Sequence, residues 1–224
     1  MEYVTVIISI FAILLTYRQI SLSKKQSLFD RRIALYEKSE KMYGLWNEHQ
    51  NLLDYKIDIL VPNAMYFSLL TNIDFLYEIV PVMKTLVENV ENHIKFLLKM
   101  EELERLSIEI EFAFKGNSAK NIALFVSCYR ELLLRMFEYE MTSSKVKKEI
   151  NELKKRTLSD FEYEKERIEI IENSLEPKTK REVNEIIDKL VQITCEIEKD
   201  DSFTKIKKQI KLFEYDLDSF RKRN

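Results

Sequence analysis

The chain opens with an apolar run that has no polar side. From Tyr3 to Tyr17 it reads YVTVIISIFAILLTY, and no charged residue stands between Glu2 and Arg18. As a helix this run covers about 22 Å, against roughly 30 Å of hydrocarbon in a bilayer. Arg18 can snorkel to the headgroups, and tyrosines suit both interfaces. We therefore expect a short transmembrane anchor over residues 1–20, carried by Tyr3, Ile7, Ile8, Phe11, Leu14, Leu15 and Tyr17.

Three other interpretations of this run compete. A cleaved signal peptide would need a basic start and a small-residue cleavage site, and neither is present. A core helix fits the length of the run, and an interfacial helix is a third option. Both would show a polar face on a small domain or at a membrane surface, and the run has none. Whether so short an anchor spans the bilayer fully or lies in the interface stays open.

Basic residues follow the anchor on one side only. They are Arg18, Lys24, Lys25, Arg31 and Arg32, whereas the other flank carries Glu2 and the chain start. The positive-inside bias predicts a single-pass protein of the inner (cytoplasmic) membrane, with its N-terminus outside and the remaining chain in the cytoplasm. The same side chains would lie at headgroup level, as topology determinants or as contacts to anionic lipid.

Small residues form a stripe along the anchor. Thr5, Ser9, Ala12 and Thr16 follow at spacings of four, three and four. Small residues let membrane helices approach closely. The stripe is therefore a candidate packing surface between anchors.

Helical spacing continues after the anchor. Apolar residues recur with helical period from residue 21 to 50, and nothing before Gly44 breaks a helix. We expect one long helix to run from the anchor into a juxtamembrane segment (21–60). A helical core (61–142) should follow, helical from about 64 to 114, with Pro81 kinking it or starting a new helix. Gly116 predicts a turn, with Asn117 or Ser118 capping a helix over 119–155.

The last third of the chain has a coiled-coil-like rhythm. Apolar residues step by four and three in runs beginning at Val146, Val183 and Ile206. Each run is only about two heptads long. Residues 143–224 therefore predict helical hairpins, whose seams pack within one chain or between chains, with packing within one chain favoured.

Composition supports an all-α fold. The sequence has only Gly 2 and Pro 3, too few for the turns that a sheet needs. The formal net charge is −2, so no nucleic acid is expected as a partner. Cys128 and Cys195 lack metal-site spacing and are expected to be buried, reduced thiols.

No catalytic, cofactor-binding or metal-binding residues emerge. His49 and His93 lie in no HExxH or Cys/His set, and no phosphate-binding glycine loop or nucleophile elbow occurs. We expect no cofactor and no enzymatic activity; a helical enzyme is the least favoured alternative.

Phe29, Arg32 and Tyr36 form the pattern F-x-x-R-x-x-x-Y just after the anchor. This pattern resembles a loosely defined group of bacterial single-pass proteins with helical cytoplasmic domains, some of which resemble membrane effectors of phage-defence systems. The likeness covers about residues 3 to 40. The three side chains share a helical face, which either binds a partner or packs within the chain.

These observations favour a membrane-anchored helical interaction or regulatory protein without catalytic activity. Its expected partners are the lipid bilayer and either another protein or a second copy of the chain. A membrane-perturbing effector, whose short anchors oligomerise, is the alternative from another class.

Overall fold

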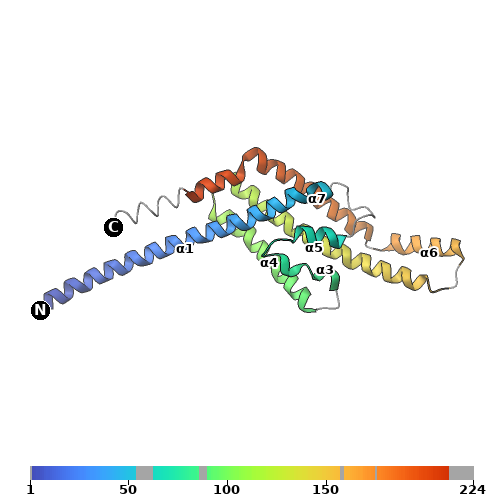
Figure 1. Cartoon of the computed structure of the whole chain (residues 1–224), viewed down its shortest axis with the longest axis horizontal. Coiled ribbons are helices and arrows are strands. Elements are labelled where there is room, and N and C mark those ends of the chain that lie inside the picture. The colour runs from blue at the N-terminus through green and yellow to red at the C-terminus, as the bar shows by residue number, and fades with distance from the viewer. Residues whose placement is uncertain (1, 54–62, 86–89, 157–158, 175, 212–224) are drawn as a thin grey trace.

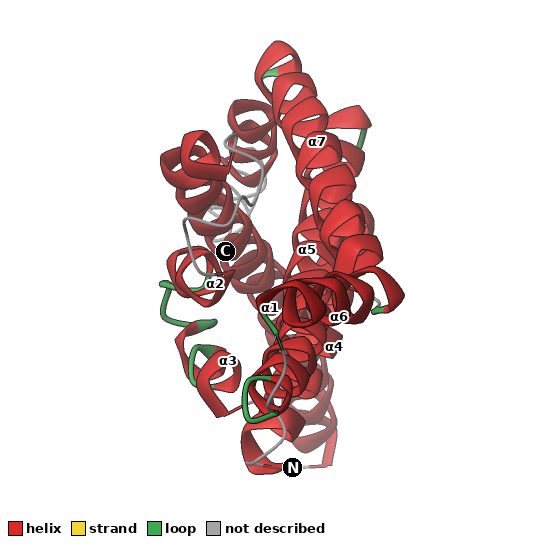
Figure 2. Cartoon of the chain, turned by 90° about the vertical axis from the view of Figure 1, so that its right-hand side faces the viewer, coloured by secondary structure: helices red, strands yellow, loops and turns green. Residues whose placement is uncertain are grey.

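The structure, a computed structural model, describes residues 2–53, 63–85, 90–156, 159–174 and 176–211 (Figure 1); the side chains of residues 2–11 lie outside this description. Every regular element in these ranges is helical, which confirms the all-α prediction (Figure 2). The elements are α1 (Glu2–Leu53), α2 (Asn63–Leu70), the 3-10 helix η1 (Tyr77–Ile79), α3 (Val82–Thr85), α4 (Val90–Ala113), α5 (Asn117–Leu153), α6 (Asp160–Asn173), α7 (Glu176–Asp200) and a helical segment over 202–211 that follows α7.

α1 is one uninterrupted helix of 52 residues, about 78 Å long. The predicted continuity of anchor and juxtamembrane segment is confirmed at the level of the backbone. The N-terminal half of α1 stands clear of the other helices, and its C-terminal half lies across them (Figure 1). Leu35 is the first fully buried side chain along the described part of α1. The helix thus has a projecting part and a part embedded in the body.

α5 is the central helix of the body, and α4 and α7 make its main contacts. The core between them is strongly aromatic, and its largest fully buried side chains include Trp46, Phe67, Phe96, Phe125 and Tyr129. The hydroxyl of Tyr129 donates a hydrogen bond of 2.5 Å to the carbonyl of Leu70. This bond satisfies a polar group that water cannot reach.

The segment between α1 and α5 is more broken than the sequence suggested. The predicted single helical region is wrong, because α2 ends at Leu70 and a turn leads through η1. The second alternative at Pro81 is confirmed, because α3 begins directly after it. The hydroxyl of Thr71 donates to the carbonyl of Phe67 at 2.7 Å, and such side-chain bonds compete with the helical ladder. Asn72 and Asp74, which favour turns, then complete the break.

The turn at Gly116 is confirmed, with φ of 88° in a region that favours glycine. Its capping differs from the prediction. Gly116 itself occupies the N-cap of α5, where no side chain accepts a hydrogen bond, and the hydroxyl of Ser118 donates to Asp200 at 2.6 Å instead. The side chain predicted to cap α5 therefore joins α5 to the end of α7.

The coiled-coil-like seam of α7 packs within the chain. Val183, Ile187, Leu190, Thr194 and Ile197 are all buried. Its hydrophobic stripe faces α5, its main neighbour.

A helix break that was not predicted lies before α6, where Ser159 and Glu162 form a capping box. Of the last predicted seam, Ile206 and Ile210 are buried, and the positions beyond Lys211 lie outside the described residues.

Candidate functional site

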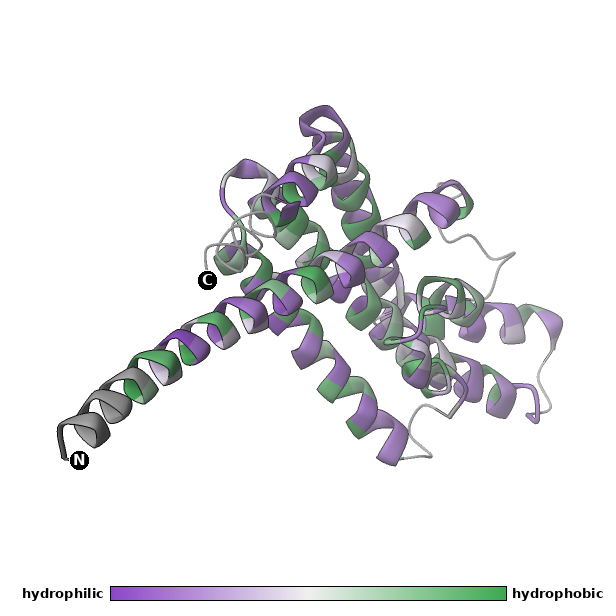
Figure 3. Cartoon of the chain, turned by 60° about the vertical axis from the view of Figure 1, so that its left-hand side comes forward, coloured by the Kyte–Doolittle hydropathy of each residue, from purple (hydrophilic) through white to green (hydrophobic). Residues whose placement is uncertain are grey.

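The projecting part of α1 exposes large apolar side chains on several sides. Ile13, Leu14 and Leu15 are each more than half exposed. They follow one another at steps of about 100° around the helix, so no polar face separates them. Figure 3 shows apolar turns in green along this part. The first apolar residues of α1 that pack against the core are Phe29 and Ile33, and Leu35 is the first buried one along the described part of the helix.

Of the other predicted anchor and stripe residues, only those from residue 12 onward have described side chains. Tyr17, Ala12 and Thr16 are exposed, and the hydroxyl of Thr16 donates to the carbonyl of Ala12 at 2.8 Å, so it needs no outside partner. The remaining anchor and stripe positions have side chains outside the described residues: Tyr3, Thr5, Ile7, Ile8, Ser9 and Phe11.

In the part of the chain that the structure describes, no helix is long and apolar enough to cross a bilayer.

The basic residues after the anchor fall into two groups. Arg18, Lys24 and Lys25 are exposed on the projecting part of α1. Arg31 instead forms an ion pair of 2.8 Å with Glu109 of α4. The guanidinium carbon of Arg32 lies 5.8 Å from the centroid of the Phe114 ring. The second group therefore contacts the body.

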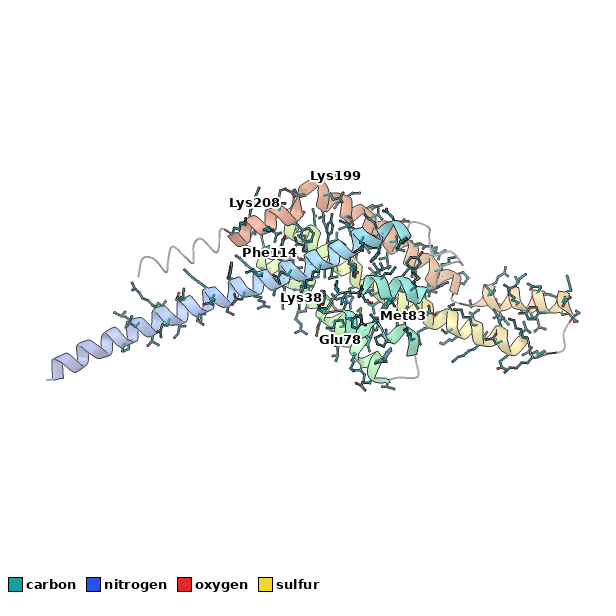
Figure 4. All side chains as sticks on the ribbon, viewed as in Figure 1. Lys38, Glu78, Met83, Phe114, Lys199 and Lys208 are labelled. Atoms are coloured by element: carbon teal, nitrogen blue, oxygen red, sulfur yellow. The ribbon has the colours of Figure 1, made fainter. Side chains whose placement is uncertain are left out.

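Phe29, Arg32 and Tyr36 all make contacts within the chain. Phe29 packs against the core, and the ring of Tyr36 meets that of Phe203 edge-on, with centroids 6.1 Å apart. The Tyr36 hydroxyl donates to Glu40 at 2.5 Å, and burial together with Glu40 raises its pKa. Phe114 marks the end of the body from which α1 projects (Figure 4). The three residues thus lie in the part of α1 (residues 29–43) where the projecting helix meets the other helices, which we call the joint.

α4 carries a second apolar face that the sequence reading missed. Its buried residues are Phe96, Lys99, Met100, Leu103, Leu106 and Ile110. Val90, Ile94, Leu97, Leu98, Ile108 and Phe112 are large apolar side chains of the same helix, and all are exposed. They form two exposed apolar patches on one side of the helix, separated by charged residues around 101–105, and exposed apolar patches often mark interaction sites. The sequence contains both sets of apolar residues, each at helical spacing, within the same segment 90–113.

An open groove of about 910 Å³ runs between the end of α5 and α6. Val146 and Leu153 lie in it, with Lys145, Lys148 and Glu169 among the charged residues of its lining. The mixed charges and the open shape give no arrangement of acid, base and nucleophile.

Titratable groups elsewhere serve structure. Asp200 accepts hydrogen bonds from Lys205, Ser118 and Ser202, and these donors lower its pKa to about 2. The carboxylate also lies at the N-terminal end of α5, where negative charge is favoured. Cys128 is buried as expected, and burial raises its pKa; Cys195 is exposed, which corrects the expectation for that thiol.

Across the residues that the structure describes, no three His, Cys, Asp or Glu side chains are grouped to hold a metal ion. No protein-family model, curated protein or solved structure matches the chain.

Proposed function

We propose that this chain is a membrane-tethered, non-catalytic interaction protein. About the first 20 residues of α1 insert into the cytoplasmic membrane. The exposed part of α1 from there to the joint is a stalk that holds the helical body at the cytoplasmic face. The observation that carries the proposal is the projecting half of α1, whose described large apolar side chains from Ile13 to Ile20 are exposed.

Lipid is the partner that suits this part of α1. Burying Ile13, Leu14 or Leu15 is worth roughly 1.5–3 kcal/mol each, and all three are left exposed by the fold. A protein groove would cover one side of the helix, whereas these side chains point to more than one side of it. Arg18 lies just beyond them, where its long side chain can reach the headgroups.

The joint makes the stalk rigid with respect to the body. Arg31 pairs with Glu109, and the rings of Tyr36 and Tyr43 both contact Phe203. Since α1 is continuous from the projecting part through this joint, the anchor fixes how the body is presented. The protein in this proposal offers its exposed faces to a partner near the membrane and performs no chemistry of its own.

Fractionation of cells that express the full chain tests the anchor. We expect the protein to stay in the membrane pellet after an alkaline wash. Changing Ile8 and Phe11, near the middle of the Tyr3–Tyr17 run, together to Lys should release it, because each charge costs about 2.5–3.5 kcal/mol at the centre of a membrane helix. The matched control changes Phe161 and Ile168 of α6, which are also exposed, to Lys and should stay in the pellet. Release of the unmodified chain by the wash would refute the proposal.

The exposed thiol of Cys195 reports the orientation. A maleimide that cannot cross membranes should label it only after the inner membrane is opened. Labelling from outside in intact spheroplasts would reverse the proposed direction of the chain.

A further inference from the structure

The exposed face of α4 is large and regular. Ile94 is 51% exposed, Leu98 55%, Ile108 50% and Phe112 87%. A surface helix normally turns polar residues to water on the side opposite its buried face. At 100° per residue these four side chains lie opposite the buried residues of α4, such as Leu103. α4 therefore carries apolar residues on two opposite sides, and the other helices of the body bury only one of them.

Spacing defines what kind of partner this face suits. Six exposed residues follow at intervals of four, three, four, three and four, which is the seam of a two-stranded coiled coil. They are Ile94, Leu98, Glu101, Arg105, Ile108 and Phe112. Read from either end, the seam has two apolar residues, two charged residues of opposite sign and two apolar residues. A seam with this symmetry is complementary to itself when one copy is reversed.

We propose that α4 pairs with α4 of a second copy in an antiparallel, two-fold symmetric dimer centred near Leu103. In this register Glu101 of each copy faces Arg105 of the other. Ile94 then faces Phe112, and Leu98 faces Ile108, in the two copies. A parallel pair would instead place Glu101 against Glu101 and Arg105 against Arg105, so repulsion selects the antiparallel arrangement.

The two central charges are available for this role. Most other charged residues of α4 are already paired within the chain: Glu91 with Lys95, Lys99 with Glu102, Glu104 with Arg130, and Glu109 with Arg31. In the described part of the chain, Glu101 and Arg105 are exposed and enter no ion pair. The seam thus keeps one acid and one base unpaired, at the positions where a reversed copy supplies the opposite charge.

The arrangement also suits two chains in one bilayer, and in this respect it rests on the proposed function. The two-fold axis of an antiparallel pair is perpendicular to both helices. α4 crosses α1 steeply in Figure 1 instead of running beside it. An axis along α1 therefore reverses α4 while leaving both projecting helices pointing the same way.

Charge exchange on the full chain, purified in detergent, tests the pairing. Sedimentation should give a dimer for the unmodified protein. E101R and R105E, made singly, each place like charges opposite one another twice per dimer and should weaken association by about tenfold or more. The double exchange E101R/R105E should restore it. Leu98→Glu should abolish the dimer, and Ile168→Glu, at a position of α6 that is 52% exposed, should leave it unchanged.

The register is checked by cysteine crosslinking in a Cys195→Ser background. A mixture of L98C and I108C chains should give the mixed disulfide, and L98C alone should give little. The inference would be overturned if the protein were monomeric at all concentrations. It would also be overturned if the α4 variants left the dimer unchanged, or if the double exchange failed to restore association. Membrane fractionation separates this result from the fate of the anchor, because a chain can be membrane-bound and monomeric, or dimeric and released.

Discussion

Tyr43→Ala is the change that most directly loosens the joint between stalk and body. The Tyr43 ring lies between two aromatic partners, Phe125 with centroids 5.6 Å apart and Phe203 with centroids 4.9 Å apart. Its hydroxyl donates to Glu198 of α7 at 3.3 Å. One side chain of α1 therefore contacts α5, α7 and the helix that follows α7.

The expected loss follows from these contacts. Truncating a fully buried aromatic residue to alanine costs about 3–5 kcal/mol. Tyr43 is only partly buried, so removing its ring should lower the free energy of unfolding by about 2 kcal/mol through lost burial. Two ring contacts add about 0.5 kcal/mol each at the low end of their range. We expect Tyr43→Ala to lower the free energy of unfolding by about 3 kcal/mol.

Trp46 supplies the assay. It is the single tryptophan of the chain, fully buried and less than one turn from Tyr43. Urea unfolding of the full chain in a mild detergent, followed by Trp46 emission, gives the midpoint and slope for each variant. The control Tyr43→Phe keeps both ring contacts and loses only a long, exposed hydrogen bond, so its loss should stay within about 0.5 kcal/mol. A loss below about 1 kcal/mol for Tyr43→Ala, or equal losses for both variants, would refute this view of the joint.

Two further predictions concern the turns that hold α5 and α7. The pKa of Asp200 is lowered from 3.8 to about 2, chiefly by Lys205, so the stability it contributes is present above pH 4 and is lost as the pH falls towards 2. Asp200→Asn should therefore reduce the difference in urea midpoint between pH 6 and pH 2.5, and an unchanged difference would contradict this role. Gly116→Ala should cost about 1–3 kcal/mol, because φ of 88° strains any side chain although open space surrounds the site. A neutral effect on the thermal midpoint would show that the turn relaxes.

Local chemistry explains which parts of the fold were predictable. The scarcity of glycine and proline leaves helices as the only common element, and the uninterrupted pattern before Gly44 leaves α1 unbroken. Gly116 marks a turn because its backbone conformation disfavours other residues. The break before α6 was also written in the sequence, as the capping pair Ser159 and Glu162, but charge-rich heptads on both sides obscured it.

Tertiary packing explains what the sequence left open. α4 has two faces with helical period, and periodicity alone does not say which one the body covers. Leu103 meets the core, whereas Leu98, five residues earlier, remains exposed. The same limit applies to Arg32 and Tyr36, whose shared face could bind a partner or pack. Their contacts with Phe114 and Phe203 depend on residues far along the chain.

In the proposed arrangement about the first 20 residues of α1 lie in lipid, while the rest of α1 and the body lie in water. Spin labels at Leu14, Leu28 and, as a control on α6, Phe161 measure this directly in reconstituted vesicles, through their accessibility to oxygen and to a polar nickel complex. We expect high oxygen and low nickel accessibility at Leu14, and the reverse at Leu28 and Phe161. A label at Leu14 as accessible to nickel as the label at Phe161 would contradict it.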